Sequence, residues 1–132
     1  MVIFDSSIFV DDLRTGCYGE RVSSIEDLVR TSSVVLAELW RGATSTAEQS
    51  FLRALARKFP VLTPTEANWL DSGLILLRVQ ADHGFEAKKL RDLHFDLLIA
   101  LTARTHGARL ITSNRSDFEL IRTYRDFKLE LW

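Results

Sequence analysis

Four acidic residues interrupt segments that would otherwise belong to a hydrophobic core, and they constrain the fold more than any other feature. They are Asp5 after Val2–Phe4, Glu38 within Val34–Trp40, Asp96 within Leu93–Ile99, and Asp117 shortly after Leu110–Thr112. An ionised carboxylate that leaves water without a partner costs several kcal/mol, and neighbouring carboxylates repel one another. The fold must therefore supply a basic partner, a proton or a metal cation to these acids.

The spacing of apolar residues predicts strands that alternate with helices. Apolar runs predict strands at 1–4, 59–62, 108–112 and 127–131, and Pro60 favours a sheet edge for the second of them. Helices are expected over 6–13, 34–42, 46–58, 63–84, 92–106 and 116–124. Residues 15–20 should form a loop, and residues 25–30 a helical turn with a short strand. This alternation indicates an α/β fold, a three-layer α/β/α sandwich with a mainly parallel central sheet, in a single domain over residues 1–132.

Two of these helices have distinct sequence signals. For the helix that ends at Gly84, Thr63 is the expected N-cap, Pro64 the first residue, and Glu66 the reciprocal capping partner. The helix over 92–106 is apolar on all sides at its centre, so we expect it to be covered on both sides.

The acids could meet at one edge of such a sheet. Ligands of open parallel sheets bind outside the carboxyl ends of the strands. If the strands that precede Asp5 and Asn114 are neighbours, Asp5 and Asp117 lie at one edge, and Glu38 and Asp96 reach in from flanking helices. Hard divalent cations prefer such oxygen ligands. A structural interpretation stays open, because Asp5 and Asp117 can cap the following helices and Glu38 can lie on a solvated face.

The composition excludes several other classes of protein. A formal net charge of −1 over 132 residues argues against a protein that coats nucleic acid through bulk positive charge. No apolar run reaches the length of a membrane-spanning helix, and the start lacks the pattern of a signal peptide, so we expect a cytoplasmic protein with no membrane partner. The single cysteine, Cys17, cannot form an internal disulfide, and the three histidines share no zinc-ligand spacing.

In this order and spacing, the acidic segments resemble the PIN-domain ribonucleases, and among them the VapC toxins of bacterial toxin–antitoxin pairs. The resemblance covers nearly the whole chain. The segments that carry it are Val2–Ser7, Ser33–Gly42, Phe95–Ala100 and Leu110–Phe118. Ser7 is a departure, because the family often has Asn there.

The resemblance implies a parallel sheet between helices, hydrolysis of RNA with Mg²⁺ or with Mn²⁺ as a substitute, a homodimer, and an antitoxin that occupies the site. It implies that the catalytic residues and metal ligands are Asp5, Glu38, Asp96 and the more variable fourth acid, Asp117. The supporting polar residues it implies are Ser6, Thr112 and Asn114. Next to the helix of the third acid, Lys88, Lys89 and Arg91 could hold the RNA backbone, or they could form a solvated basic patch.

In this interpretation a metal-activated water attacks the phosphodiester in line and leaves a 5′ phosphate and a 3′ hydroxyl. Asp5 and Asp96 are expected to be direct or water-bridged ligands, while Glu38 and Asp117 complete the shell and orient the water.

Three alternatives remain at this point. They are a nuclease of DNA or structured RNA outside a toxin pair, a catalytically idle interaction module, and a signalling receiver domain. A receiver needs adjacent acids after its first strand and a lysine at the end of a late strand. Here two serines follow Asp5, and Asn114 stands at the late position.

Overall fold

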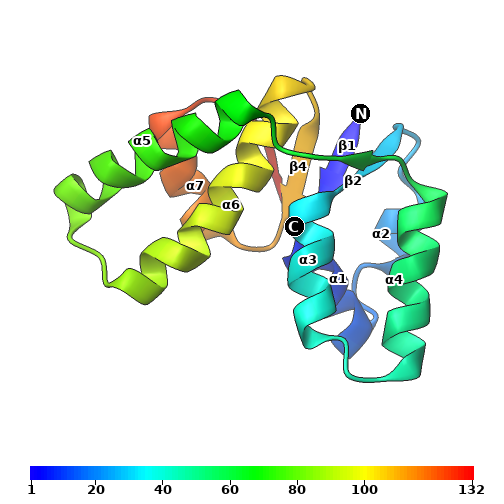
Figure 1. Ribbon diagram of the computed structural model, residues 1–132. Helices are drawn as coiled ribbons and strands as arrows, with labels where there is room; N and C mark the ends of the chain where they lie inside the picture. The colour runs from blue at the N-terminus through cyan, green and yellow to red at the C-terminus, as the bar shows by residue number, and fades with distance from the viewer.

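The computed structural model describes residues 1–132 and is built around a five-stranded sheet whose strand pairs are all parallel (Figure 1). The order of the strands across the sheet is β3-β2-β1-β4-β5. The strands are β1 (Val2–Phe4), β2 (Val29–Ser32), β3 (Val61–Leu62), β4 (Arg109–Thr112) and β5 (Lys128–Leu131). The helices are α1 (Ser6–Thr15), α2 (Gly19–Ser23), α3 (Ser33–Gly42), α4 (Thr46–Lys58), α5 (Glu66–His83), α6 (Ala87–Thr105) and α7 (Arg115–Tyr124).

Alternation along the central strands sends side chains to two separate cores, as a sheet covered on both faces requires. Ile3 and Leu110 join the larger core, which contains apolar residues of α3, α5, α6 and α7. Their neighbours Val2, Phe4 and Ile111 face the other way and pack with Ile8 of α1. The predicted α/β/α sandwich around a parallel sheet is therefore confirmed.

Helix α6 is the most enclosed helix, as its apolar centre predicted. Residues 96–103 are all buried. Helix α5 packs along α6 and lies on the outside of the molecule (Figure 1). None of the helices combines the length and the apolar character that crossing a lipid bilayer requires.

The predicted starts of two helices are wrong. Helix α5 begins at Glu66, with Thr65 as its N-cap and Asn68 as the reciprocal partner, rather than at Thr63. The side-chain amide of Asn68 also donates to Thr105 Oγ1 of α6 at 3.0 Å, a tertiary contact that favours this register.

Helix α6 begins at Ala87 instead of Asp92, because Leu90, Leu93 and Leu97 continue its apolar face. Its N-cap, Glu86, makes no side-chain capping bond, so the sequence carried no start signal there. Another departure is α2, whose first residues lie in the predicted loop. Val22 of this helix packs against the smaller core. The edge position of the strand after Pro60 is confirmed, since β3 is outermost.

Candidate functional site

The site lies at the carboxyl ends of β1 and β4, which are neighbours in the sheet, as the expected convergence required. Phe4 pairs with Ile111, and the Asp5 backbone N–H donates to the Ile111 carbonyl at 2.9 Å. This register places Asp5 beside Thr112, whose hydroxyl donates to Asp5 Oδ2 at 2.8 Å. Asp5 also caps α1 by accepting from the Ser7 N–H, so capping and a place in the site are compatible.

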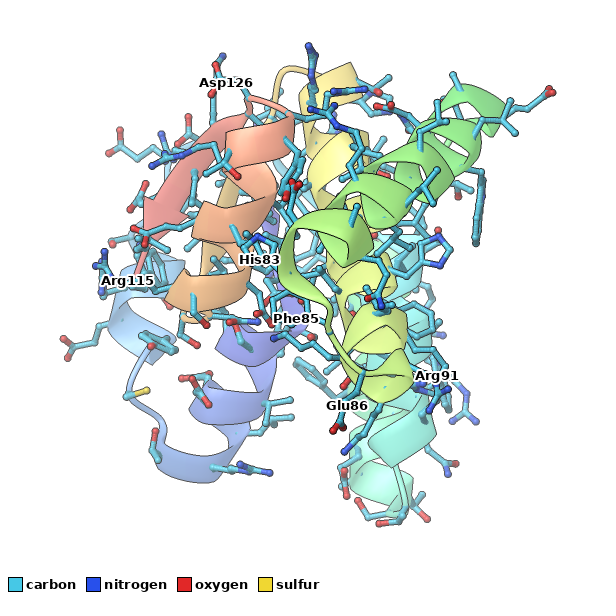
Figure 2. The ribbon with its side chains drawn as sticks, turned by 90° about the vertical axis from the view of Figure 1, so that its left-hand side faces the viewer. His83, Phe85, Glu86, Arg91, Arg115 and Asp126 are labelled. Atoms are coloured by element: carbon cyan, nitrogen blue, oxygen red, sulfur yellow. The ribbon has the colours of Figure 1, made fainter.

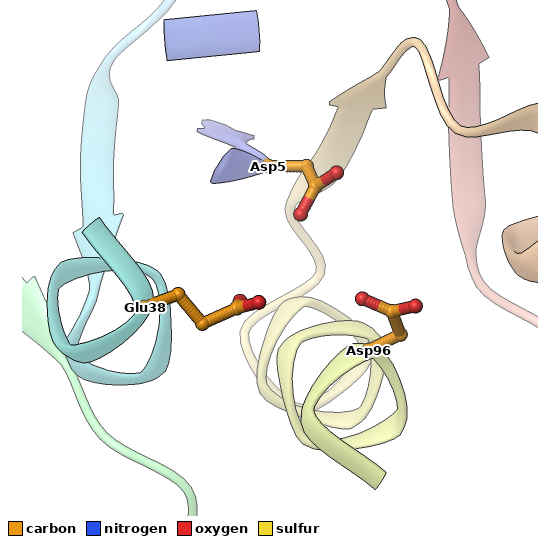
Figure 3. Close-up of side chains that lie close together, drawn as sticks. All are labelled: Asp5, Glu38 and Asp96. Atoms are coloured by element: carbon orange, nitrogen blue, oxygen red, sulfur yellow. The ribbon is translucent and has the colours of Figure 1, made fainter. Parts of the chain in front are cut away.

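Three carboxylates from distant parts of the chain converge here. Asp5 follows β1, Glu38 projects from α3, and Asp96 projects from α6 (Figure 3). One carboxylate oxygen of each lies within 4.8 Å of the others. Asp5 and Asp96 are buried, with 2% and 8% of their surfaces exposed, and Glu38 is half-buried. Three carboxyl groups are therefore held together in a largely dry site.

The hydrogen bonding of these acids is incomplete. Asp5 Oδ1 and Glu38 Oε1 are buried and have no hydrogen-bond partner in the chain. A buried oxygen without a donor is costly unless a cation or a proton meets it. An all-carboxylate set with free buried oxygens fits a hard divalent cation, which takes oxygen ligands.

Burial and mutual repulsion change how the acids titrate. Burial first, and then the charges of Asp5, Glu38 and Asp117, raise the pKa of Asp96 to about 9, while Lys89 acts in the opposite direction. Burial and the nearby charge of Asp5 raise the pKa of Glu38 to about 7, and Arg41 opposes this rise. Without a cation, the cluster favours bound protons at neutral pH.

Asp117 lies next to this cluster but is already paired. Lys89 Nζ lies 2.5 Å from Asp117 Oδ1, and the Asn114 side-chain amide donates to Oδ2 at 3.1 Å. Asn114 also caps α7. The structure thus brings together the three acids of the expected triad and holds the expected fourth acid beside them through a lysine. This ion pair was missed, because Lys89 and Asp117 are far apart in the sequence.

The two serines that follow Asp5 lie in different surroundings. Ser6 lines a cavity of about 640 Å³ that Glu38 and Arg41 also line. Ser7 lies against the acids: its Oγ is 3.1 Å from Thr112 Oγ1 and accepts from the Ser113 N–H at 3.1 Å. Sequence reasoning chose Ser6 as the supporting residue and missed these contacts of Ser7, which depend on the pairing of β1 with β4.

The three basic residues lie on α6 itself instead of before it. Lys88 and Arg91 are exposed, whereas Lys89 is half-buried against Asp117. Figure 2 shows Arg91 on the side of α6 that faces away from α7. Positions 89 and 91 are about 200° apart around a helix, so the three basic residues do not form a single patch.

Comparison with known proteins places this arrangement among related folds. The family model for the PIN domain matches residues 2–124. The structure of VapBC-1 from nontypeable Haemophilus influenzae is similar, with 27% identity, a TM-score of 0.71, and coverage of 100% of this chain and 98% of that chain. VapBC2 from Rickettsia felis, bound to a DNA fragment from their promoter, gives 22% identity and a TM-score of 0.75, with 100% and 99% coverage.

A third similar structure is VapBC-5 from Mycobacterium tuberculosis, a member of the VapBC family of toxin-antitoxin systems, with 20% identity, a TM-score of 0.59, and 99% and 98% coverage. At these lower identities, the second and third structures show likeness of fold alone. The search of curated proteins found no similar sequence.

Proposed function

Since the chain belongs to the PIN-domain family, we propose that it is a metal-dependent endoribonuclease that acts as the toxin of a toxin–antitoxin pair. One observation carries the catalytic part of this proposal: Asp5, Glu38 and Asp96 converge, with buried oxygens that no hydrogen bond satisfies. We further propose that residues 1–132 form a single nuclease domain and that the protein acts in the cytoplasm.

The residues that would hold Mg²⁺, or Mn²⁺ in its place, are Asp5, Glu38 and Asp96, with Asp117 close by. A divalent cation bound there would polarise the phosphoryl oxygens, stabilise the leaving 3′ oxygen and lower the pKa of its bound water. The hard oxygen donors support this class of cation over zinc.

The chain's own side chains prepare the site for hydrolysis. The Thr112 hydroxyl fixes the orientation of Asp5 by donating to Oδ2. Glu38 lines the open cavity, where its carboxylate can orient the attacking water. Lys89 is anchored by Asp117 at the other side of the cluster, where it can also attract the RNA backbone, with exposed Lys88 and Arg91 farther out.

A cognate antitoxin is the proposed protein partner. The support is the likeness, over the whole chain at 27% identity, to a protein of VapBC-1. A toxin needs an inhibitor that keeps RNA from its acids, and the cavity beside Glu38 gives such an inhibitor access to them.

We also propose a homodimer. Helix α5 exposes Leu70, Leu74 and Leu77, at 66%, 60% and 69% of their surfaces, and they recur on one side of the helix. Contiguous exposed apolar side chains are typical of interaction surfaces, and two-fold homodimers bring the same patch of two copies together.

RNA cleavage by the purified protein tests the catalytic proposal. Single-stranded RNA should be cut with Mg²⁺ or Mn²⁺, remain intact with excess chelator, and be cut again when the cation is restored. Asp5→Asn should abolish cleavage. A matched control is Asp126→Asn, because Asp126 is exposed, makes no hydrogen bond or ion pair, and lies beyond the far end of α7 (Figure 2).

Other outcomes identify the alternatives. Full activity in excess chelator contradicts the metal mechanism. Cleavage of DNA but not of RNA indicates a nuclease of a different substrate class. No cleavage of either by folded protein, with every cation tried, indicates an idle interaction module. Family membership already argues against a receiver domain.

A further inference from the structure

Arg41 is a positive charge at the edge of the three acids that the proposed mechanism does not use. It lies on α3 three residues after Glu38, so the two side chains project from the same side of the helix. Both line the cavity of about 640 Å³, together with Ser6 and Arg14. Arg41 therefore stands where the cavity meets the acid cluster.

An aromatic ring of another helix supports this guanidinium. The Arg41 Cζ lies 5.0 Å from the centre of the Phe95 ring. Phe95 immediately precedes Asp96 on α6 and packs against the larger core. A guanidinium held by its face against a ring keeps its N–H edge available for hydrogen bonds, and stacking limits its motion. Arg41 thus bridges α3 and α6, the two helices that carry Glu38 and Asp96.

The N–H groups of Arg41 have no acceptor within the chain. Arg41 takes part in none of the ion pairs, although Glu38 is one helical turn away. The arginines that donate side-chain hydrogen bonds are Arg30, Arg109, Arg115 and Arg125. On the opposite side of the cluster, in contrast, Lys89 is paired with Asp117. Arg41 is consequently a cation beside the acids that is free to meet a ligand.

We infer that Arg41 is a phosphate-binding residue, which holds an RNA phosphate at the mouth of this cavity and positions the backbone against the three acids. The inference rests on the proposed function, because RNA is its ligand. A planar guanidinium matches two phosphate oxygens, and a phosphate is the anionic group that RNA presents at regular intervals. An RNA phosphate at this position is an anion that approaches carboxylates, which repel it. A fixed cation is therefore needed on its path.

RNA binding as a function of salt tests this role separately from catalysis. The probe is a fluorescein-labelled single-stranded RNA of mixed sequence, and the proteins carry Asp96→Asn so that the probe is not cleaved. Each lost phosphate contact should reduce the slope of log affinity against log salt by about 0.7. We expect Arg41→Ala to reduce the slope by about that amount. Arg41→Lys should restore the slope but only part of the affinity, because it keeps the charge and loses the planar stack.

Arg53 provides the matched control. It is an exposed arginine on α4 that lies over the Trp40 ring at 5.4 Å, and it does not line the cavity. Arg53→Ala removes an equal charge and the same kind of stack, but outside the cavity, so it should leave the salt slope unchanged. With Asp96 intact, Arg41→Ala should raise KM for RNA by about tenfold, in line with a charge-assisted hydrogen bond, and change kcat little.

The outcomes separate this inference from the proposed function. Equal salt slopes for Arg41→Ala and Arg53→Ala overturn the inference, even if the wild type cleaves RNA as proposed. A slope that Arg41→Lys fails to restore also overturns it, because the loss would then come from altered structure and not from charge. A reduced slope for Arg41→Ala, together with no cleavage by the wild type, supports phosphate binding and contradicts the nuclease proposal.

Discussion

Replacing Asp96 with asparagine should abolish RNA cleavage yet leave the metal-free protein at least as stable as the wild type. Asp96 is 8% exposed and stands near Asp5, Glu38 and Asp117, so its negative charge is unfavourable in the folded state. The substitution keeps the size and shape of the side chain and removes that charge. For most buried polar residues the opposite result, a loss of stability, is expected.

The size and pH dependence of the effect follow from the raised pKa. Folding raises the pKa of Asp96 from 3.8 to about 9, so the folded state binds a proton more tightly than the unfolded state. The stabilisation that this bound proton gives to the fold is fully present below pH 3.8 and is lost as the pH rises towards 9. Each linked proton contributes a slope of about 1.4 kcal/mol per pH unit. At neutral pH and above, we expect Asp96→Asn to be more stable than the metal-free wild type by about 1 kcal/mol or more. This is the free energy that corresponds to a pKa shift of about one unit.

Thermal and denaturant unfolding with excess chelator, from pH 5 to pH 9, measure this effect. Since the pKa of Glu38 is about 7, both acids contribute to the slope of the wild type below that pH. Above it the wild type should continue to lose stability with rising pH, while the Asp96→Asn protein should change much less. Adding Mg²⁺ should stabilise the wild type through preferential binding to the folded state and stabilise the variant less.

Asp126→Asn is the control, because Asp126 is exposed and makes no hydrogen bond or ion pair. It should change stability by no more than about 0.5 kcal/mol, as surface substitutions do. Strong destabilisation of metal-free Asp96→Asn would refute the reasoning. Asp96 would then be a structural hydrogen-bonding residue and not part of a repulsive cation site.

Producing the chain alone in a bacterium should arrest growth, and Asp5→Asn should prevent the arrest; normal growth with abundant soluble wild type would contradict a toxin. Leu74→Glu combined with Leu77→Glu should convert a dimer into a folded monomer in light-scattering measurements, and a wild type that is already monomeric would remove the homodimer proposal. Asp117→Asn should lower kcat by about 10- to 100-fold, as loss of a supporting contact does, and less than Asp96→Asn does, because Lys89 already neutralises Asp117. Equal losses in the two variants would show that Asp117 is as essential as the triad.

The sequence was sufficient for the features that depend on local pattern. The apolar run before Asp5 and the run before Thr112 could be recognised as strands, and strand ends at one edge of a parallel sheet lie close together. The all-apolar centre of α6 indicated burial, which made Asp96 exceptional before any geometry was known. The three converging acids could thus be named from their apolar neighbours and their places at strand ends or within helices.

Features that depend on tertiary contacts could not be predicted in this way. The start of α5 depends on Asn68 reaching Thr105 of α6, and two capping patterns in neighbouring registers look alike without that contact. The pairing of Lys89 with Asp117 joins α6 to α7, and the role of Ser7 depends on Thr112 of β4. In each case the deciding partner is far away in the sequence, so no local pattern reveals it.

The position of the acids links the proposed metal site to the most buried part of the fold. Asp96 projects from the helix that contributes most to the larger core, and Asp5 follows the central strand of the sheet. Such rigid elements hold the three carboxylates close together despite their repulsion, because moving any one of them apart would expose apolar core. The packing of α6 therefore opposes the repulsion that a bound cation would relieve. It follows that loosening the core near Leu97 should weaken cation binding along with stability, since the acids would then be free to separate.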